Sequence, residues 1–423
     1  MSDRLDPLQR FHPFTRLNAL LAGIEPAAAR PLLFSVGEPQ QTPPELIRPL
    51  LTENLADWGR YPPTLGTAAF REAVAEWLAR RFHLPAGMVD PDRHVMPCAG
   101  TRQALFFIAL AAVPEAEAGR PAVLMPNPFY HVYAGAAAMA GAEPVFLPAT
   151  AETGFLPDPE AVPREVLART ALAYVCSPAN PQGAVADRRY LARWLELGRE
   201  HGFTVAFDEC YSEIYRDKPP EGALEAAAEA GGSLEGLMVF HSLSKRSAGA
   251  GLRSGFVAGD PRLVQRIAQL VNYGGVAVPL PILAASTALW RDEAHVAVNR
   301  ALYNENFALA RRILGNRLGH ATPEGGFFLW LDVGDGETAA KRLWAEAGLK
   351  VLPGGYMART DANGQNPGQR YIRVALVYDT AATAEGLERL VRVLAPDSQR
   401  PGSPGTLPDE ARPEKVRPKE VRQ

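Results

Sequence analysis

The sequence predicts an α/β protein in which helices cover a mostly parallel sheet and a smaller α/β domain follows. In the middle of the chain, short apolar runs alternate with helical patterns, as parallel strands joined by crossover helices require. From about residue 286, a long helical pattern is followed by two further strand candidates. The 423 residues, of which 47% are hydrophobic, suffice to bury the cores of two domains.

The N-terminal part of the chain predicts two helices separated by a loop. Leucines at helical spacing over residues 16–23, with Gly23 at the end, predict a short helix. Prolines interrupt residues 30–44, which indicates a loop. The run AAFREAVAEWLARRF, within residues 67–83, has the pattern of an amphipathic helix.

Six apolar runs predict the strands of the large sheet, and helical patterns separate most of them. The runs are Ala122–Met125, Pro144–Leu147, Ala171–Cys176, Thr204–Phe207, Met238–His241 and Gly255–Ala258. A continuous helix is predicted from about residue 286 to Leu318. Two strands of the second domain are predicted after it, Gly326–Leu331 and Tyr371–Leu376.

These elements divide the chain into three ordered parts and a tail. Residues 1–44 are an N-terminal arm and helix that pack with the small domain, 45–285 are the large domain, and 286–395 are the small domain. Residues 396–423 combine Pro, Gly and charged side chains and lack the apolar content to fold, so a disordered tail is expected there.

Composition and charge exclude several classes of protein. The net charge of -3, from 44 basic and 47 acidic side chains, gives no reason to expect nucleic acid. The first residues do not resemble a secretory signal, and the longest apolar run, Ala104–Val113, is about half as long as a membrane span. Three cysteines in scattered apolar contexts favour reduced, buried thiols, although one internal disulfide is formally possible. We expect a cytoplasmic protein with no membrane partner and no metal.

The first motif that can carry chemistry is Ser242-Leu-Ser-Lys245, which follows the apolar run Gly236–Phe240. A lysine just past a buried strand is desolvated, which lowers its pKa and frees the amine as a nucleophile. Eight residues later, Arg253 can hold a phosphate with two hydrogen bonds, and the hydroxyls of Ser242 and Ser244 can add donors. A surface lysine in a serine-rich turn would produce the same pattern.

The second motif, Asp208-Glu-Cys-Tyr211, follows the strand candidate TVAF. A carboxylate at the carboxyl end of a parallel strand stands where ligands bind in open α/β sheets. If a pyridine ring lies there, ionised Asp208 keeps the ring nitrogen protonated, and Tyr211 can donate to a phenolic oxygen of the ring. The alternative is that Asp208 only caps the next helix.

The third motif is Ser177-Pro-Ala-Asn180-Pro-Gln-Gly183, again directly after an apolar strand candidate. Its prolines and glycine predict an irregular turn that can expose the Asn180 amide at the edge of the sheet. By itself, the run is an ordinary turn sequence.

The fourth motif places small residues before an apolar helix, in Pro97-Cys-Ala-Gly100-Thr-Arg102. Backbone N–H groups at a helix N-terminus bind phosphate well, and a glycine lets the ligand approach closely. An ordinary capped helix is the alternative.

Together, the order and spacing of these four motifs resemble the class I/II aminotransferases of fold type I, from about residue 34 to 395. This resemblance implies pyridoxal 5′-phosphate as cofactor and a seven-stranded, mostly parallel sheet in the large domain. It also implies amino acid and 2-oxo acid substrates and a homodimer with shared active sites.

The resemblance further implies roles for individual residues. Lys245 matches the lysine that forms a Schiff base with the cofactor and then moves the proton between the substrate Cα and the cofactor. Asp208 matches the partner of the pyridine nitrogen, and Tyr211 and Asn180 match the pair hydrogen-bonded to the cofactor O3′. Tyr130, in NPFYHVY, matches the aromatic side chain stacked on the pyridine. Lys245, Asp208 and Tyr211 are therefore expected to be catalytic.

The remaining matches concern the phosphate and the substrate. Arg373 matches the arginine that binds the α-carboxylate with two hydrogen bonds, with help from the Gly37 backbone N–H and from Asn180. Tyr61, in RYPPTLG, matches a tyrosine that reaches the phosphate of the neighbouring subunit. The positions that match phosphate ligands in the same chain are Gly100, Thr101, Arg102, Ser242, Ser244 and Arg253.

Several runs, among them SLSKRS, DECYSEIY and FHPFTRL, resemble one branch, the N-succinyl-L,L-diaminopimelate aminotransferases of lysine and peptidoglycan precursor synthesis. That branch uses glutamate and 2-oxoglutarate as the partner pair. The segment Tyr273–Val278 departs from the pattern of the branch. The alternatives are an aspartate, alanine or aromatic aminotransferase, a cysteine-S-conjugate β-lyase, and a non-enzymatic ligand-sensing module. Intact Lys245, Asp208, Arg253 and Arg373 argue against the last of these.

Overall fold

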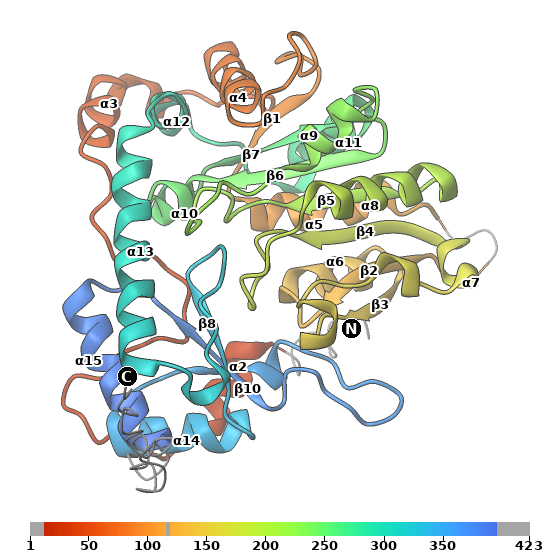
Figure 1. The fold of residues 1–423 in the computed structure, drawn as a ribbon. Helices are drawn as coiled ribbons and strands as arrows, with labels where there is room; N and C mark the ends of the chain where they lie inside the picture. The colour runs from red at the N-terminus through yellow and green to blue at the C-terminus, as the bar shows by residue number, and fades with distance from the viewer. Residues whose placement is uncertain (1–11, 116–118, 396–423) are drawn as a thin grey trace, which may run out of the picture.

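The computed structural model describes residues 12–115 and 119–395, which form a large seven-stranded sheet, a small three-stranded sheet and the helices around them (Figure 1). The predicted disordered tail, 396–423, lies outside the described residues. The proposed division into domains at 44/45 and 285/286 stays a prediction.

The large sheet has the strand order β1-β7-β6-β5-β4-β2-β3. Strands β2 to β6 pair in parallel, and β7 is antiparallel to both of its neighbours. This confirms the predicted mostly parallel sheet of seven strands. They are β1 (Val95–Cys98), β2 (Ala122–Asn127), β3 (Glu143–Pro148), β4 (Thr170–Cys176), β5 (Thr204–Asp208), β6 (Leu237–Ser242) and β7 (Gly255–Gly259).

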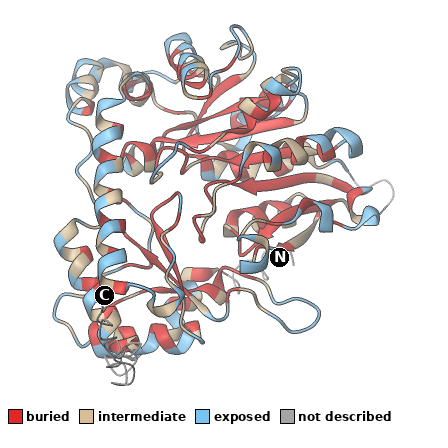
Figure 2. Ribbon diagram, viewed as in Figure 1, coloured by how far each residue is buried: buried red, intermediate tan, exposed pale blue. Residues whose placement is uncertain are grey.

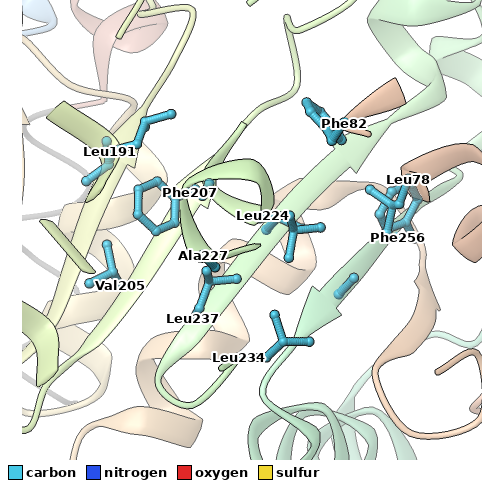
Figure 3. Packing of buried hydrophobic residues seen from close by; sticks show 14 of the residues in the cluster. Leu78, Phe82, Leu191, Val205, Phe207, Leu224, Ala227, Leu234, Leu237 and Phe256 are labelled. Carbon is cyan, nitrogen blue, oxygen red and sulfur yellow. The ribbon is translucent and has the colours of Figure 1, made fainter. Parts of the chain in front are cut away.

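Helices cover both faces of this sheet because its central strands are apolar on both sides. Val205 and Phe207 of β5 pack in one core cluster, whereas Ala206 between them packs in another. Figure 3 shows the first cluster, in which Phe207 and Leu237 lie near Leu191 and Leu224. The helices on that face are α4 (Ala68–Arg81), α8 (Arg188–His201), α9 (Ala223–Glu229) and α12 (Leu280–Arg291); those on the other are α5 (Thr101–Ala112), α6 (His131–Met139) and α11 (Pro261–Gly274).

The strand directions bring the four motifs to one edge of the sheet. In the parallel pairs, Cys176 at the end of β4 lies beside Asp208 at the end of β5, and β6 continues the same edge. Because β7 is antiparallel, its first residue, Gly255, pairs with Ser242, the last residue of β6. Gly255 also pairs with Cys98 at the end of β1. Residues just before β7 and just after the other strands therefore meet at this edge.

The small sheet is antiparallel, with the order β8-β10-β9. In the central strand, Ile372 and Val374 join the hydrophobic core beneath the sheet, so Arg373 between them projects from the opposite face. The elements here are β8 (Phe328–Asp332), β9 (Leu352–Pro353), β10 (Tyr371–Ala375), α14 (Gly336–Ala347) and α15 (Thr380–Leu394).

The N-terminal segment runs beside the small sheet. Leu32 N–H donates to the Gly348 carbonyl at 2.9 Å, and Ala375 N–H donates to the Phe34 carbonyl at 2.8 Å. Helix α2 (Pro13–Leu20) contacts β9, and α3 (Ile47–Glu53) contacts α12. These contacts hold the segment that leads to Gly37.

Three predicted elements differ from the observed ones. The helix predicted from 286 to Leu318 is two helices, α12 and α13 (Ala294–Leu314), because the chain leaves the helical conformation at Asp292. Helix α2 begins at Pro13, earlier than predicted, because proline is well suited to the first turn of a helix. Strand β1 was not predicted because its sequence contains Pro97. In the described sheet, β1 is an edge strand beside β7, and proline is tolerated in edge strands.

Burial follows this architecture, with buried strands inside and exposed outer helix faces in Figure 2. Cys98 and Cys176 are buried, Cys210 is half-buried, and none of the three forms a disulfide. Within the described ranges, no helix is long and apolar enough to cross a membrane.

Candidate active site

Two adjoining cavities, of about 190 Å³ and 450 Å³, lie at the sheet edge where the motifs meet. Lys245, Tyr130 and Arg102 line both of them. Of all the residues predicted for the site, Tyr61 alone lines neither cavity. The others are brought together there: Gly37, Gly100, Thr101, Arg102, Tyr130, Asn180, Asp208, Tyr211, Ser242, Ser244, Lys245, Arg253 and Arg373.

Lys245 lies three residues past β6, in the short helix α10 (Leu243–Arg246), and its Nζ donates to the Gly37 carbonyl. Burial lowers the pKa of Lys245 to about 8. No carboxylate accepts a hydrogen bond from it in the described part of the chain, and the electrostatic effects of Cys210 and Glu38, which raise the pKa, do not cancel the effect of burial. The side chain is therefore a nucleophilic amine at neutral to mildly alkaline pH.

Asp208, at the end of β5, is buried, and both of its oxygens accept hydrogen bonds. The Tyr133 hydroxyl donates to Oδ2 at 2.6 Å, and the Cys210 backbone N–H donates to Oδ1 at 3.3 Å. Burial raises the pKa of Asp208, while the hydrogen bonds from Cys210 and Tyr133 oppose the rise. No arginine or lysine pairs with it among the described residues, so a cationic ligand group would complete its surroundings.

Tyr133 is itself held by its neighbours. Its ring stacks on Tyr174, with centroids 4.4 Å apart and planes 11° apart, and the Tyr174 hydroxyl donates to the Leu105 carbonyl at 2.7 Å. Both rings are buried. The Tyr133 hydroxyl is therefore fixed in place against Asp208.

The larger cavity is lined by the residues predicted to bind phosphate. Gly100 has a φ of +80°, and a Cβ there would lie 2.3 Å from Arg253 Nη2, so a side chain would displace the guanidinium. Among the described residues, the Arg253 guanidinium donates only to carbonyl oxygens, those of Ala250 at 3.0 Å and Ala99 at 3.3 Å. The Ser242 hydroxyl accepts from the Ser244 N–H at 3.1 Å. This donor-rich group suits a phosphate.

Arg373 projects from the small sheet into the smaller cavity. Its Nη1 donates to Asn180 Oδ1 at 3.0 Å and its Nη2 donates to the Ser35 carbonyl at 2.7 Å. Its buried Nε has no hydrogen-bond partner among the described residues. Burial lowers the pKa of Arg373 to about 10. A buried guanidinium without a carboxylate partner fits an anionic ligand.

Gly37 closes the cavity beneath the small sheet, where a Cβ would lie 2.6 Å from the Phe328 ring. Tyr211 also lines the cavity and packs against the rings of Phe327 and Phe328. Burial raises the pKa of Tyr211, so its hydroxyl is a donor at neutral pH. The Tyr130 hydroxyl accepts from Arg102 Nε at 2.9 Å.

Helix α13 is hydrogen-bonded to the short helix α10, which carries Lys245. Asn299 Nδ2 donates to the carbonyls of Lys245, at 2.9 Å, and Arg246, at 3.1 Å. His295 lies between Ser247 Oγ, 2.8 Å from Nε2, and Asp292. This serine is 1% exposed and lines neither cavity, so the chain of three side chains fixes the loop and does not form a nucleophilic site.

Sequence reasoning missed Tyr133 and His131, although both lie in the NPFYHVY run. Tyr133 comes three residues after Tyr130, the spacing that places two side chains on one side of a helix turn, and this signal could have found it. Phe14, in the FHPFTRL run, and Met357 also line the smaller cavity, and neither was predicted because no pattern in the sequence places their segments beside the sheet edge.

The donors and acceptors at this edge fit pyridoxal phosphate. They include a nucleophilic lysine and, counting partners in the described part of the chain, a buried carboxylate with no lysine or arginine and an arginine with no carboxylate. No group of His, Cys, Asp and Glu side chains within the described ranges could hold a metal ion.

Residues 30–393 match the family described as aminotransferase class I and II. A similar curated protein is the 4-dedimethylamino-4-oxo-anhydrotetracycline transaminase OxyQ of Streptomyces rimosus, 33% identical over 86% of this chain and 95% of its own length. An LL-diaminopimelate aminotransferase of Desulforudis audaxviator is 32% identical over 89% of this chain and 94% of its own length.

Among solved structures, an aminotransferase from Neisseria meningitidis is 40% identical, covers 93% of this chain and all of that chain, and has a TM-score of 0.88. The family match spans most of the chain and includes every residue at the cavities except the N-terminal ones. The chain belongs to the class I and II aminotransferases, which depend on pyridoxal 5′-phosphate.

Proposed function

We propose that this aminotransferase acts on a long-chain amino dicarboxylate of the diaminopimelate type, with Lys245 as its catalytic amine. The observation that carries the catalytic part is a desolvated lysine that shares one cavity with Asp208 and Arg373. When bound, pyridoxal phosphate supplies a carbonyl that condenses with amines and a protonated ring that withdraws electrons from the substrate Cα.

Lys245 has two tasks in this proposal. Its neutral amine, favoured by the lowered pKa, would supply the nucleophile that condenses with the carbonyl of the cofactor. When it is not bound to the cofactor, the same amine would accept the proton from the substrate Cα as a general base and return it as a general acid. The hydrogen bonds from Asn299 to the loop keep the side chain within reach of that carbon.

Asp208 and Arg373 would hold different parts of the bound groups. Asp208 would keep the proton on the ring nitrogen of the cofactor, and Tyr211 and Asn180 would donate to the ring oxygen. Arg373 binds the α-carboxylate with its guanidinium, with the Gly37 backbone N–H as a second donor. Gly100, Thr101, Ser242, Ser244 and Arg253 hold the phosphate.

The substrate proposal is supported by the relatives and by the cavity. The resemblance within the sequence favours N-succinyl-L,L-diaminopimelate, whereas similar curated proteins are LL-diaminopimelate aminotransferases. The two compounds share a long carbon chain with a carboxylate distant from the reacting amine. We keep the succinylated compound as the proposed substrate and glutamate as the partner amine.

A panel of amino donors tests this proposal. Purified protein with cofactor is assayed for kcat/KM with the succinylated compound, free LL-diaminopimelate, aspartate, alanine and tyrosine, each against 2-oxoglutarate. We expect the succinylated compound to exceed the short and aromatic donors by about a hundredfold or more, because sites built for polar groups reject analogues that lack them. An equal kcat/KM with a short donor would refute the proposed substrate, but the assignment as an aminotransferase would stand.

A second candidate is a bulky apolar oxo substrate. Rings and aliphatic chains form much of the smaller cavity, among them Phe14, Phe129 and Met357, and OxyQ is named for a polycyclic substrate. A hydrophobic amine that matched the succinylated compound in the same panel would favour this candidate. Release of pyruvate from a cysteine conjugate would instead indicate a β-lyase.

We also propose that two copies of the chain share their active sites through an exposed apolar surface. Trp58 is 51% exposed, Tyr61 and Tyr273 are almost fully exposed, and Val276 is 61% exposed. The Thr64 hydroxyl donates to Asn272, which ties the two segments together. Exposed apolar side chains gathered in this way are typical of protein interfaces.

Subunit exchange tests the shared site. Tyr61→Phe and Lys245→Ala proteins are each assayed, mixed, and shown by a mass tag to exchange subunits. If Tyr61 serves the partner, partial activity returns in the mixture, because one site of the heterodimer has both residues intact. Exchange without recovery, given an impaired Tyr61→Phe parent, would contradict the cross-subunit role.

A further inference from the structure

The smaller cavity is lined by more cationic than anionic side chains, and one of the cations has no partner in the proposed function. Arg102, Lys245 and Arg373 line it, whereas Asp208 is its one acidic residue. Asp208 faces the pyridine nitrogen, Lys245 reacts with the cofactor, and Arg373 takes the α-carboxylate. Arg102 remains as a cation whose Nε donates to the uncharged Tyr130 hydroxyl at 2.9 Å.

His131 adds a polar group on the substrate side of this cavity. It lines the smaller cavity and is absent from the wall of the larger one, where Arg253 and the two serines lie. Its ring contacts Tyr130 edge-on, with centroids 4.8 Å apart, and His12, at 4.9 Å. Neither ring nitrogen has a hydrogen-bond partner among the described residues. An imidazole N–H is therefore available to a ligand.

The electrostatic field at His131 is positive. Burial first, and then His12, Arg102, Arg373 and Arg359, lower the pKa of His131 to about 4. The imidazole is therefore uncharged at neutral pH and donates one N–H. Nearby cations, of which Arg373 is buried and Arg102 exposed, disfavour a further proton on the imidazole, and they favour an anion for the same reason.

Apolar side chains line the rest of the smaller cavity. Phe14, Phe129, Phe328, Leu352 and Met357 contribute to it. A chain of methylene groups fits such walls, whereas a short, fully polar side chain would leave them uncovered. The cavity thus offers one cation for the α-carboxylate, an apolar middle, and a second polar group.

We propose that His131 and Arg102 form an anion subsite that binds the distal carboxylate of a long-chain amino dicarboxylate. This inference rests on the proposed function, which it deepens by assigning the residues that read the far end of the substrate. The imidazole N–H and the guanidinium donate to the carboxylate oxygens, while Arg373 holds the α-carboxylate. The alternative is that Arg102 serves only the cofactor phosphate, since it also lines the larger cavity.

A matched pair of donors isolates the distal carboxylate. L-α-aminopimelate and L-α-aminoheptanoate have the same chain length and differ in having a carboxylate or a methyl group at the far end. The holoenzyme should show a kcat/KM at least about tenfold higher for aminopimelate, because a hydrogen bond to a charged group contributes about that factor or more. No preference for aminopimelate would overturn the subsite.

Variants of His131 then test the residue. His131→Phe keeps an aromatic ring beside Tyr130 but removes the donor, so the preference for aminopimelate should fall roughly tenfold while the rate with aminoheptanoate is unchanged. His131→Asn restores a donor and should recover part of the preference. An unchanged preference in His131→Phe, or an equal loss with both donors, would overturn the role of His131.

Binding without turnover gives an independent readout. Pimelate and heptanoate lack the amine, so they can bind but cannot be transaminated. Their dissociation constants are measured by titration, from the change in absorbance of the bound cofactor. Pimelate should bind about tenfold more tightly to the native protein and lose this advantage in His131→Phe and Arg102→Gln. If Arg102→Gln lowers only the affinity for the cofactor, Arg102 belongs to the phosphate site and the proposed pair is wrong.

The outcomes for the subsite and for the substrate are separable. If aminopimelate is preferred through His131 but neither form of diaminopimelate is a good donor, the subsite stands and the substrate proposal fails. If the succinylated compound is the best donor and the His131 variants leave its kcat/KM unchanged, the subsite fails and the substrate proposal stands.

Discussion

The cofactor-facing and substrate-facing halves of the site are built in different ways. Asp208, Ser242, Lys245 and Arg253 lie within a few residues of strand ends in one sheet, and backbone pairing places them beside one another. Phe14, His131, Met357 and Arg373 instead come from a helix, a helix start, a loop and the small sheet. Strand order therefore accounts for the first half, whereas only packing between distant segments assembles the second.

This difference separates chemistry from selectivity. In the proposed function, the groups at strand ends and Arg373 treat every amino acid alike, whereas Phe14, His131 and Met357 contact whatever lies beyond the α-carbon. Variants in the first half should change turnover for all donors by a similar factor. Variants of Phe14, His131 and Met357 should instead change the ranking of donors.

The largest effect is expected at Lys245. In the proposed function, Lys245→Ala removes both the nucleophile and the proton carrier, and general acid–base groups contribute about 10²–10⁴-fold each. Turnover should fall by at least a factor of about a thousand for every donor. Borohydride reduction of the native protein, followed by peptide mapping, should locate the cofactor on Lys245. An adduct on another lysine would break the assignment of the cofactor-facing half.

A loss of about a hundredfold or more is expected for Asp208→Ala, with cofactor still bound, since each 1.4 kcal/mol of lost barrier stabilisation costs about tenfold in rate. The loss should be equal for short and long donors, because the ring nitrogen is remote from the distal end. Rates and cofactor content are measured together. Near-normal turnover would mean that Asp208 only caps the following turn.

The pH dependence of cofactor capture tests the electrostatics of Lys245. Only the neutral amine attacks, and burial lowers the pKa of Lys245 to about 8. The rate at which apoprotein takes up cofactor should therefore rise about tenfold per pH unit below 8 and level off above it. Stopped-flow absorbance measures this rate. A rise that continues to pH 10 would show that the amine is not desolvated.

A smaller effect is expected for Tyr133→Phe, which leaves Asp208 without its hydrogen bond at 2.6 Å. A hydrogen bond to a charged group contributes about 1.5–3 kcal/mol, so turnover should fall roughly tenfold or somewhat more. Tyr133→His keeps a donor and should lose less. The absorbance of the bound cofactor should also shift with pH in Tyr133→Phe. If the spectrum and the rate are unchanged, Tyr133 is only a packing residue.

The smallest effect is expected for His295→Ala, which removes the link to Ser247 but leaves both hydrogen bonds from Asn299. Turnover should fall by a few fold for all donors, with KM little changed, since ordinary hydrogen bonds contribute about 1 kcal/mol. Asn299→Ala, which frees the backbone of Lys245 itself, is the matched variant and should lose more. A change in donor preference would place α13 in the substrate-facing half.

By itself, the sequence determined the class of fold and most of the cofactor-facing half. Apolar runs predicted six of the seven strands, and a polar residue after a buried parallel strand has one place to go, the ligand edge of the sheet. The remaining site residues were predicted from the family resemblance that the order of the motifs supports. Arg373 is one of them, since its local sequence by itself predicts only a charged residue at the end of a strand.

The tertiary structure alone added the side chains that line the smaller cavity beyond the predicted Gly37, Asn180 and Arg373. His131 and Tyr133 are two residues apart on one helix, yet one lines the cavity and the other reaches Asp208 beneath it. Phe14 and Met357 reach the same cavity from positions separated by more than three hundred residues. No local pattern records such contacts, because they depend on how the small sheet and the N-terminal helix pack against the large sheet.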